Sequence, residues 1–165
     1  MVKKEELAFS SIDVSSVIRE TVLLVNGDAA LRNVRVCVDV SSALPHARGD
    51  KIQLQQVVLN LLVNSFEAMK DVPVEEREVL VLTELDHADM VHTAIKDCGL
   101  GLTSDNKEKI FQPFYTTKHN GLGIGLSISR AIIEAHGGQL WAENSSDRGA
   151  TFHFTLPVNG QEVKQ

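Results

Sequence analysis

The segment from Asp97 to Ser127 reads DCGLGLTSDNKEKIFQPFYTTKHNGLGIGLS, and two clusters of glycine mark its ends. The first cluster holds Gly99 and Gly101, and the second consists of Gly121, Gly123 and Gly125. Because glycine has no Cβ atom and adopts positive φ readily, such clusters let the backbone approach a ligand closely. About twenty residues of poorly periodic sequence separate the clusters. A loop of that length inside a compact domain is usually functional or disordered.

The sequence from Leu126 onward (LSISRAIIEAH) has the pattern of a helix. A glycine turn that leads into a helix is a ready anion site, because the first N–H groups have no partner within the helix and the dipole is positive there. The segment therefore predicts a phosphate-binding lid between two glycine hinges.

The composition is that of one globular domain of 165 residues, with 43% hydrophobic residues. The formal net charge of −6, from 16 basic and 22 acidic residues, argues against a nucleic-acid binder, which needs a basic surface. Two cysteines, Cys37 and Cys98, are too few for a disulfide framework and favour the reducing cytoplasm. We find no signal peptide and no apolar run long enough to span a bilayer, so we expect no direct membrane contact.

Sequence patterns before the glycine segment predict two long helices and several strands. Asp13 and Asp50 are good N-caps, for helices that run to about Arg32 and Lys70. Alternating valines predict a strand over 34–40. Further strands are predicted over 9–12, 46–49, 79–85 and 90–96, and the short turn between the last two indicates an antiparallel hairpin.

After Asp97, we expect a short helix over 105–111, capped by Thr103 or Ser104. A longer helix runs from about Leu122 to His136 and ends at the glycine pair that follows it. Two final strands are predicted over 139–143 and 150–156.

The second long helix carries a polar row beside its apolar face, made of Gln53, Gln56, Asn60, Asn64 and Glu67. Asn60 and Asn64 stand one turn apart, so their amides reach the same place. Asparagine is a poor helix former, and its carbonyl oxygen is a hard ligand suited to Mg²⁺. Two solvated asparagines on an exposed face remain the alternative interpretation.

Five ordered blocks resemble the ATP-binding catalytic domain of sensor histidine kinases, a family grouped with DNA gyrase, the mismatch-repair ATPases and a heat-shock chaperone. LQQVVLNLLVNSFEAM resembles the N box, DCGLGL the first glycine box, IFQPFYTTK the F box (Phe111, Phe114, Lys118), GLGIGL the second glycine box and RGATF (Gly149, Thr151) the last nucleotide-contact block. A dinucleotide-binding fold does not fit, because GLGIG follows a lid instead of a strand.

The resemblance implies an α+β fold: a two-layer sandwich whose mixed, mostly antiparallel sheet of about five strands is covered on one face by three helices, with a long ATP lid. It also implies ATP and Mg²⁺ as cofactors. Asp97 would accept a hydrogen bond from the adenine amino group, and Asn64, with Asn60, would bind the metal. Lys118 and Asn60 would assist at the phosphates. The implied nucleotide-contact residues are Asn60, Asn64, Asp97, Gly99, Gly101, Leu102, Thr116, Thr117, Lys118, Gly121, Leu122, Gly123, Gly125, Leu126 and Thr151.

The residue at position 60 favours a kinase over its ATP-hydrolysing cousins, which hold a glutamate there, because an amide cannot act as a general base at neutral pH. The family's phosphoacceptor histidine is followed by glutamate, and none of the six histidines here is. We therefore expect residues 1–9 to be a connector from a missing phosphoacceptor hairpin, 10–158 the catalytic domain and 159–165 a polar tail.

This interpretation implies two partners, a phosphoacceptor helical hairpin and a downstream response regulator. Two alternatives share the expected fold. One is a free-standing serine kinase of the anti-sigma type, and the other is a nucleotide-binding module without catalysis. The complete F box argues against the first, and the complete glycine boxes argue against the second.

Overall fold

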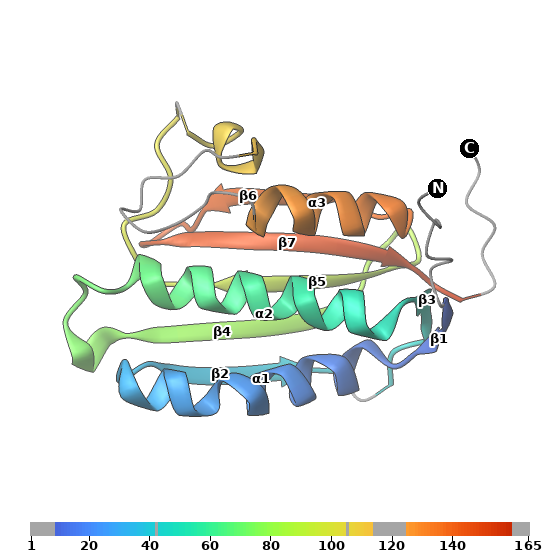
Figure 1. Cartoon of the computed structure of the whole chain (residues 1–165), viewed down its shortest axis with the longest axis horizontal. Helices are drawn as coiled ribbons and strands as arrows, with labels where there is room; N and C mark the ends of the chain where they lie inside the picture. The colour runs from blue at the N-terminus through green and yellow to red at the C-terminus, as the bar shows by residue number, and fades with distance from the viewer. Residues whose placement is uncertain (1–8, 42, 105, 114–124, 160–165) are drawn as a thin grey trace, which may run out of the picture.

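The computed structural model describes residues 9–41, 43–104, 106–113 and 125–159. Its five-stranded sheet has the order β2-β4-β5-β7-β6, in which β2 and β4 are parallel and all other neighbours are antiparallel. Three helices lie over one face of this sheet (Figure 1), so the predicted α+β sandwich is confirmed. The main elements are α1 (Val14–Leu31), β2 (Arg35–Val40), α2 (Lys51–Ala68), β4 (Glu78–Leu85), β5 (Met90–Lys96), α3 (Gly125–Ala135), β6 (Leu140–Asn144) and β7 (Ala150–Pro157).

Both predicted N-caps form. The Asp13 carboxylate accepts the N–H groups of Ser15 and Ser16 at 3.1 and 3.4 Å, and Asp50 accepts that of Gln53 at 3.1 Å. These bonds satisfy N–H groups that have no partner inside the helix, which fixes where α1 and α2 begin.

A single core fills the layer between the helices and the sheet. The large residues at its centre include Phe66 on α2, Phe154 on β7 and Ile133 on α3, each at most 1% exposed. Burying one such side chain contributes about 1.5–3 kcal/mol, so the core holds α2 and α3 over the middle strands. Val38, by contrast, is 37% exposed, because β2 is an edge strand of the sheet.

A second, two-stranded sheet pairs β1 (Ser10–Ile12) with β3 (Ala47–Gly49) at one end of the molecule. His136, just after α3, lies beneath it and is 4% exposed. Its Nδ1 lies 2.7 Å from the Ile132 carbonyl oxygen, and its Nε2 accepts the Asp50 N–H at 3.0 Å. These contacts suit a neutral imidazole, and burial lowers the pKa of His136. This histidine therefore joins the end of α3 to the start of α2.

The predicted short helix over 105–111 is only partly present. A 3₁₀ turn, η2, covers Lys109–Phe111, and a separate turn precedes it, in which Thr103 Oγ1 accepts the Asn106 N–H at 3.3 Å. Another 3₁₀ turn, η1, spans Val74–Glu76 before β4. Phe111 is buried at 6% exposure beneath the Arg130 guanidinium, whose central carbon lies 4.3 Å from the ring centroid. The first aromatic residue of the predicted F box therefore packs against α3.

The face of the sheet away from the helices carries a planar stack of aromatic rings. His92, Trp141 and His153 lie within 9° of parallel, with centroids 5.0 to 5.7 Å apart. His92 Nε2 and His153 Nδ1 lie 2.8 Å apart. The side chains of β5, β6 and β7 thus cover one another on the face that no described helix covers.

Candidate functional site

The first part of the candidate site is a buried carboxylate at the end of β5. Asp97 is 2% exposed, and its Oδ1 accepts the N–H groups of Gly99 at 2.9 Å and Ala150 at 3.2 Å. Burial raises the pKa of this carboxyl, while the two hydrogen bonds act in the opposite direction by favouring the ionised form. Both bonds use Oδ1, so Oδ2 is the atom that can accept a donor from a ligand.

Two glycines allow the chain to wrap around this carboxylate. Gly149 has φ +85°, and a Cβ there would lie less than 3.0 Å from the Asp97 carbonyl oxygen. A Cβ on Gly99 would lie 2.5 Å from the carbonyl oxygen of Ala68, at the end of α2. Only glycine fits at these positions, so the first glycine box packs directly against α2.

The polar row of α2 links this loop to the start of α3. Asn60 donates from Nδ2 to Ser129 Oγ at 3.0 Å, and a Cβ on Gly125 would lie less than 3.0 Å from the Asn60 Oδ1. Asn60, Asn64 and Ala68 are spaced at i, i+4 and i+8, so they share one face of the helix. Asn60 therefore lies beside α3 and Ala68 beside Gly99. The half-buried Asn64 comes between them.

The remaining described candidates lie at the same end of the fold. Leu102 and Leu126 are partly buried against the hydrophobic core, and Gly101 has φ +80°. Thr151 stands two residues before His153 on β7, so its side chain lies on the sheet face away from the helices, where its Oγ1 is 2.9 Å from Ser145 Oγ. Six predicted contact residues lie outside the described part of the chain: Thr116, Thr117, Lys118, Gly121, Leu122 and Gly123.

The expected metal ligands are amides, and their surroundings suit Mg²⁺. The described residues contain no group of three or more His, Cys, Asp or Glu side chains placed to hold a metal. Mg²⁺ needs few protein ligands, because it keeps waters and binds the phosphates of its nucleotide. The bond from Asn60 Nδ2 to Ser129 orients the amide and leaves the carbonyl oxygen as its acceptor. The donor set therefore fits a nucleotide-bound magnesium ion better than a metal held by protein alone.

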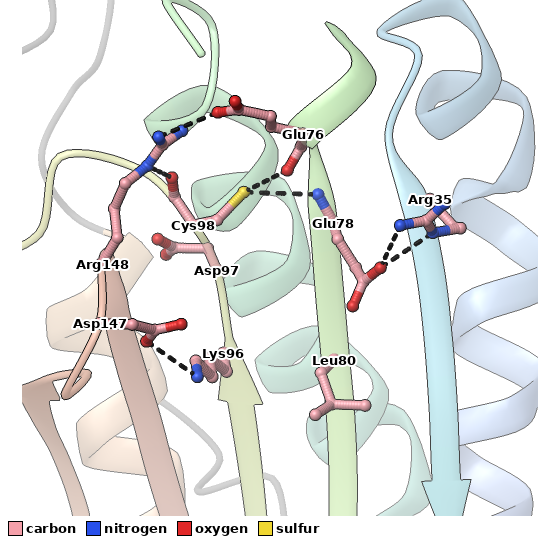
Figure 2. A pocket seen from close by; sticks show the side chains of 9 residues that line it. All are labelled: Arg35, Glu76, Glu78, Leu80, Lys96, Asp97, Cys98, Asp147 and Arg148. Atoms are coloured by element: carbon pink, nitrogen blue, oxygen red, sulfur yellow. Dashed lines mark hydrogen bonds and ion pairs between the residues drawn. The ribbon is translucent and has the colours of Figure 1, made fainter. Parts of the chain in front are cut away.

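A cavity of about 260 Å³ also borders Asp97 (Figure 2), but its charges are already paired. Arg35 binds Glu78, Lys96 binds Asp147 and Arg148 binds Glu76. With each cation neutralised, this cavity offers little attraction to a polyphosphate. Arg148 also donates from Nε to the Cys98 carbonyl oxygen at 2.7 Å, so this arginine braces the loop after β5.

Sequence reasoning missed the side chains that support the predicted residues. Ser129 orients Asn60, Asn144 bonds to Leu102, and Arg148 braces the Cys98 backbone. Ser129 had no local signal, since a serine within an amphipathic helix is unremarkable. Asn144 and Arg148 stand near the hairpin between the last two strands, where polar residues are expected in any turn.

The sequence of this chain is similar to those of known proteins. Residues 49–160 match the family described as histidine kinase-, DNA gyrase B- and HSP90-like ATPases. Sensor protein FixL of Bradyrhizobium diazoefficiens is 42% identical over 146 residues, which is 88% of this chain and 28% of FixL. The chain thus spans much less than two thirds of that relative.

Solved structures agree with this result. The catalytic domain of histidine kinase ThkA superposes with a TM-score of 0.80 at 31% identity, covering 92% of this chain and 97% of that domain. ThkA in complex with response regulator protein TrrA gives 0.78 at 30% identity, covering 95% of this chain and 44% of that one. Full-length ShkA in complex with AMPPNP gives 0.81 at 27% identity, covering 93% and 32%.

Proposed function

We propose that this chain, which belongs to the family of histidine kinase-, DNA gyrase B- and HSP90-like ATPases as the ATP-binding catalytic domain of a sensor histidine kinase, binds Mg-ATP beside α2 and α3. It then donates the γ-phosphate to a histidine on a separate helical domain. The observation that carries this proposal is the Asp97 carboxylate. Its Oδ1 is held by two main-chain N–H groups, and its Oδ2 can accept the adenine amino group. Guanine presents a carbonyl oxygen at that position and would be repelled.

The chain's own residues position the nucleotide instead of taking part in covalent chemistry. Asp97 selects the base, and Leu102 and Leu126 line its pocket. Asn60 and Asn64 would hold the magnesium ion, which would supply positive charge to the phosphates. The lid residues 116–118 and the second glycine box supply donors to the phosphates. In the transfer, the bond from the γ-phosphorus to the bridging oxygen breaks, a bond to the histidine nitrogen forms, and ADP leaves.

Asn60 explains why the nucleotide would wait for its acceptor. An amide takes no proton from water at neutral pH, so position 60 does not supply the general base that hydrolysis requires.

In the proposed parent protein, residues 1–9 connect to the phosphoacceptor hairpin, 10–158 form the catalytic domain and 159–165 form a polar tail. We also propose that this domain lies in the cytoplasm. Within the described residues, no helix is long and apolar enough to cross a membrane.

A downstream response regulator is the second proposed partner. The support is the related kinase ThkA, which has been solved in complex with the response regulator protein TrrA. Transfer from the phosphorylated hairpin to such a regulator would complete the two-component relay.

The test is calorimetric titration of the chain with ATP, GTP and AMPPNP, with and without Mg²⁺. The chain is then incubated with labelled ATP and either a separated helical hairpin or a serine substrate. We expect magnesium-dependent binding of ATP but not GTP, no self-labelling, and label on the hairpin. Strong self-phosphorylation, or label on a serine substrate only, would refute the proposal. Binding without any response to magnesium would favour the non-catalytic module.

A further inference from the structure

Asn144, the last residue of β6, makes an unusual pair of bonds with the segment that follows the first glycine box. Its Oδ1 accepts the Leu102 N–H at 2.6 Å, and its Nδ2 donates to the Leu102 carbonyl oxygen at 2.7 Å. A side-chain amide offers one acceptor and a donor in one plane, so it can pair with a residue's main chain as a neighbouring strand would. Leu102 belongs to no strand, and Asn144 supplies that missing partner.

The approach of the two segments depends on Gly101. With φ +80°, it turns the chain toward β6, and a Cβ there would lie 2.8 Å from Asn144 Oδ1 and 3.3 Å from the Gly149 carbonyl oxygen. Any other residue would be strained at this φ and would crowd the Asn144 amide. The second glycine of the DCGLGL sequence therefore suits the close approach of Asn144.

Asn144 is itself fixed by the hairpin that holds Asp97. It stands opposite Ala150 in the β6–β7 register, and Ala150 donates its N–H to the Asp97 carboxylate. The next residue, Ser145, donates its N–H to the Gly149 carbonyl oxygen at 3.0 Å. One hairpin thus sets both the carboxylate and the Leu102 backbone relative to each other.

We propose that Asn144 is a positioning residue that fixes the Gly101–Leu102 backbone at the base end of the nucleotide pocket. This inference rests on the proposed function, because it is the adenine ring that Leu102 would contact. At the base end of the pocket, Asn144 would make no contact with the phosphates. Losing its amide therefore weakens ATP and ADP by the same factor.

The experiment compares Asn144→Ala and Asn144→Asp with the wild-type chain. The aspartate keeps the acceptor for the Leu102 N–H but places a second acceptor against the Leu102 carbonyl oxygen. The matched control is Asn26→Ala, at an exposed position of α1. Three quantities are measured: amide hydrogen exchange at Leu102 by NMR, affinity for ATP and for ADP by calorimetry, and Tm without nucleotide.

We expect Leu102 exchange to accelerate at least about tenfold in Asn144→Ala, with Gly99 exchange unchanged. Both nucleotides should lose about 5- to 20-fold in affinity, the equivalent of one or two ordinary hydrogen bonds. The Tm should change little, since the bonds are solvent-exposed. The control should match the wild type.

Unchanged Leu102 exchange would overturn the proposal, as would faster exchange without loss of affinity. A loss confined to ATP would also overturn it, because it would place the effect at the phosphates. If the wild-type chain bound neither nucleotide, the proposed function itself would fail. The exchange data would still show, in that case, whether the amide pair holds Leu102.

Discussion

Replacing Asp97 by asparagine should weaken ATP binding while changing the stability of the nucleotide-free domain only slightly. The substitution keeps the size of the side chain. The asparagine carbonyl oxygen must stay where Oδ1 is, because two main-chain N–H groups point at that atom. The Nδ2 group then replaces Oδ2, so a donor faces the adenine amino group where an acceptor stood. We expect a loss of about 1.5–3 kcal/mol, which is about 10- to 150-fold in Kd.

Stability should respond differently, because the wild-type carboxylate is costly to bury. Burial raises the pKa of Asp97 above 3.8, so the folded state binds a proton more tightly than the unfolded chain. The ionised group therefore lowers stability at pH 7, and removing its charge relieves that cost. Both main-chain hydrogen bonds survive in weaker, neutral form. With these effects opposed, we expect a net change within about 1 kcal/mol, or about 2–4 °C in Tm.

The pH dependence gives a second check with a definite sign. A carboxyl with a raised folded-state pKa contributes most stability when protonated, and this contribution is lost as pH rises through that pKa. The wild type should gain stability relative to Asp97→Asn as pH falls from 7 toward 3.8. The assays are calorimetric titration with ATP and urea unfolding at several pH values, and Asp39→Asn on the exposed strand β2 is the control. Unchanged ATP affinity, or a loss of unfolding free energy well beyond about 1 kcal/mol, would refute the reasoning.

Three further predictions concern other parts of the fold. Gly149→Ala should destabilise by about 2–4 kcal/mol in urea unfolding, because it strains a positive φ and places a methyl group against a main-chain oxygen. Gly27→Ala, in open space on α1, should instead stabilise by about 0.5–1 kcal/mol, and equal signs for the two would contradict this account. The stability of the wild type relative to His136→Gln should fall as pH drops below 6.5, since His136 has a lowered pKa and its protonation removes the acceptor for the Asp50 N–H. Urea unfolding of both proteins at pH 7.5 and 5.5 measures this, and a constant difference would refute it. Asn64→Asp should alter the magnesium dependence of ATP binding more than the Tm, and an unchanged metal response would exclude Asn64 as a ligand.

Elements with strong local signals could be predicted well. The caps at Asp13 and Asp50, the apolar row of α2 and the turn between β4 and β5 all depend on nearby residues, and each lies where expected. The short helix before Phe111 was predicted less well, because only a 3₁₀ turn forms there. Helix propensity alone did not reveal that Phe111 would pack under Arg130 of α3, a contact between distant segments.

The sequence by itself determined the order of helices and strands, the glycine boxes and the residue types available to a nucleotide, because capping, periodicity and glycine geometry act over a few neighbouring residues. Only the tertiary structure decided which atoms remain available for a ligand. It brought the Ala150 N–H to Asp97 Oδ1, set Asn60 against Ser129 and paired Asn144 with Leu102, a residue 42 positions away in the chain. These contacts join elements that meet only when the core forms, and no local pattern encodes a hydrogen bond between distant segments.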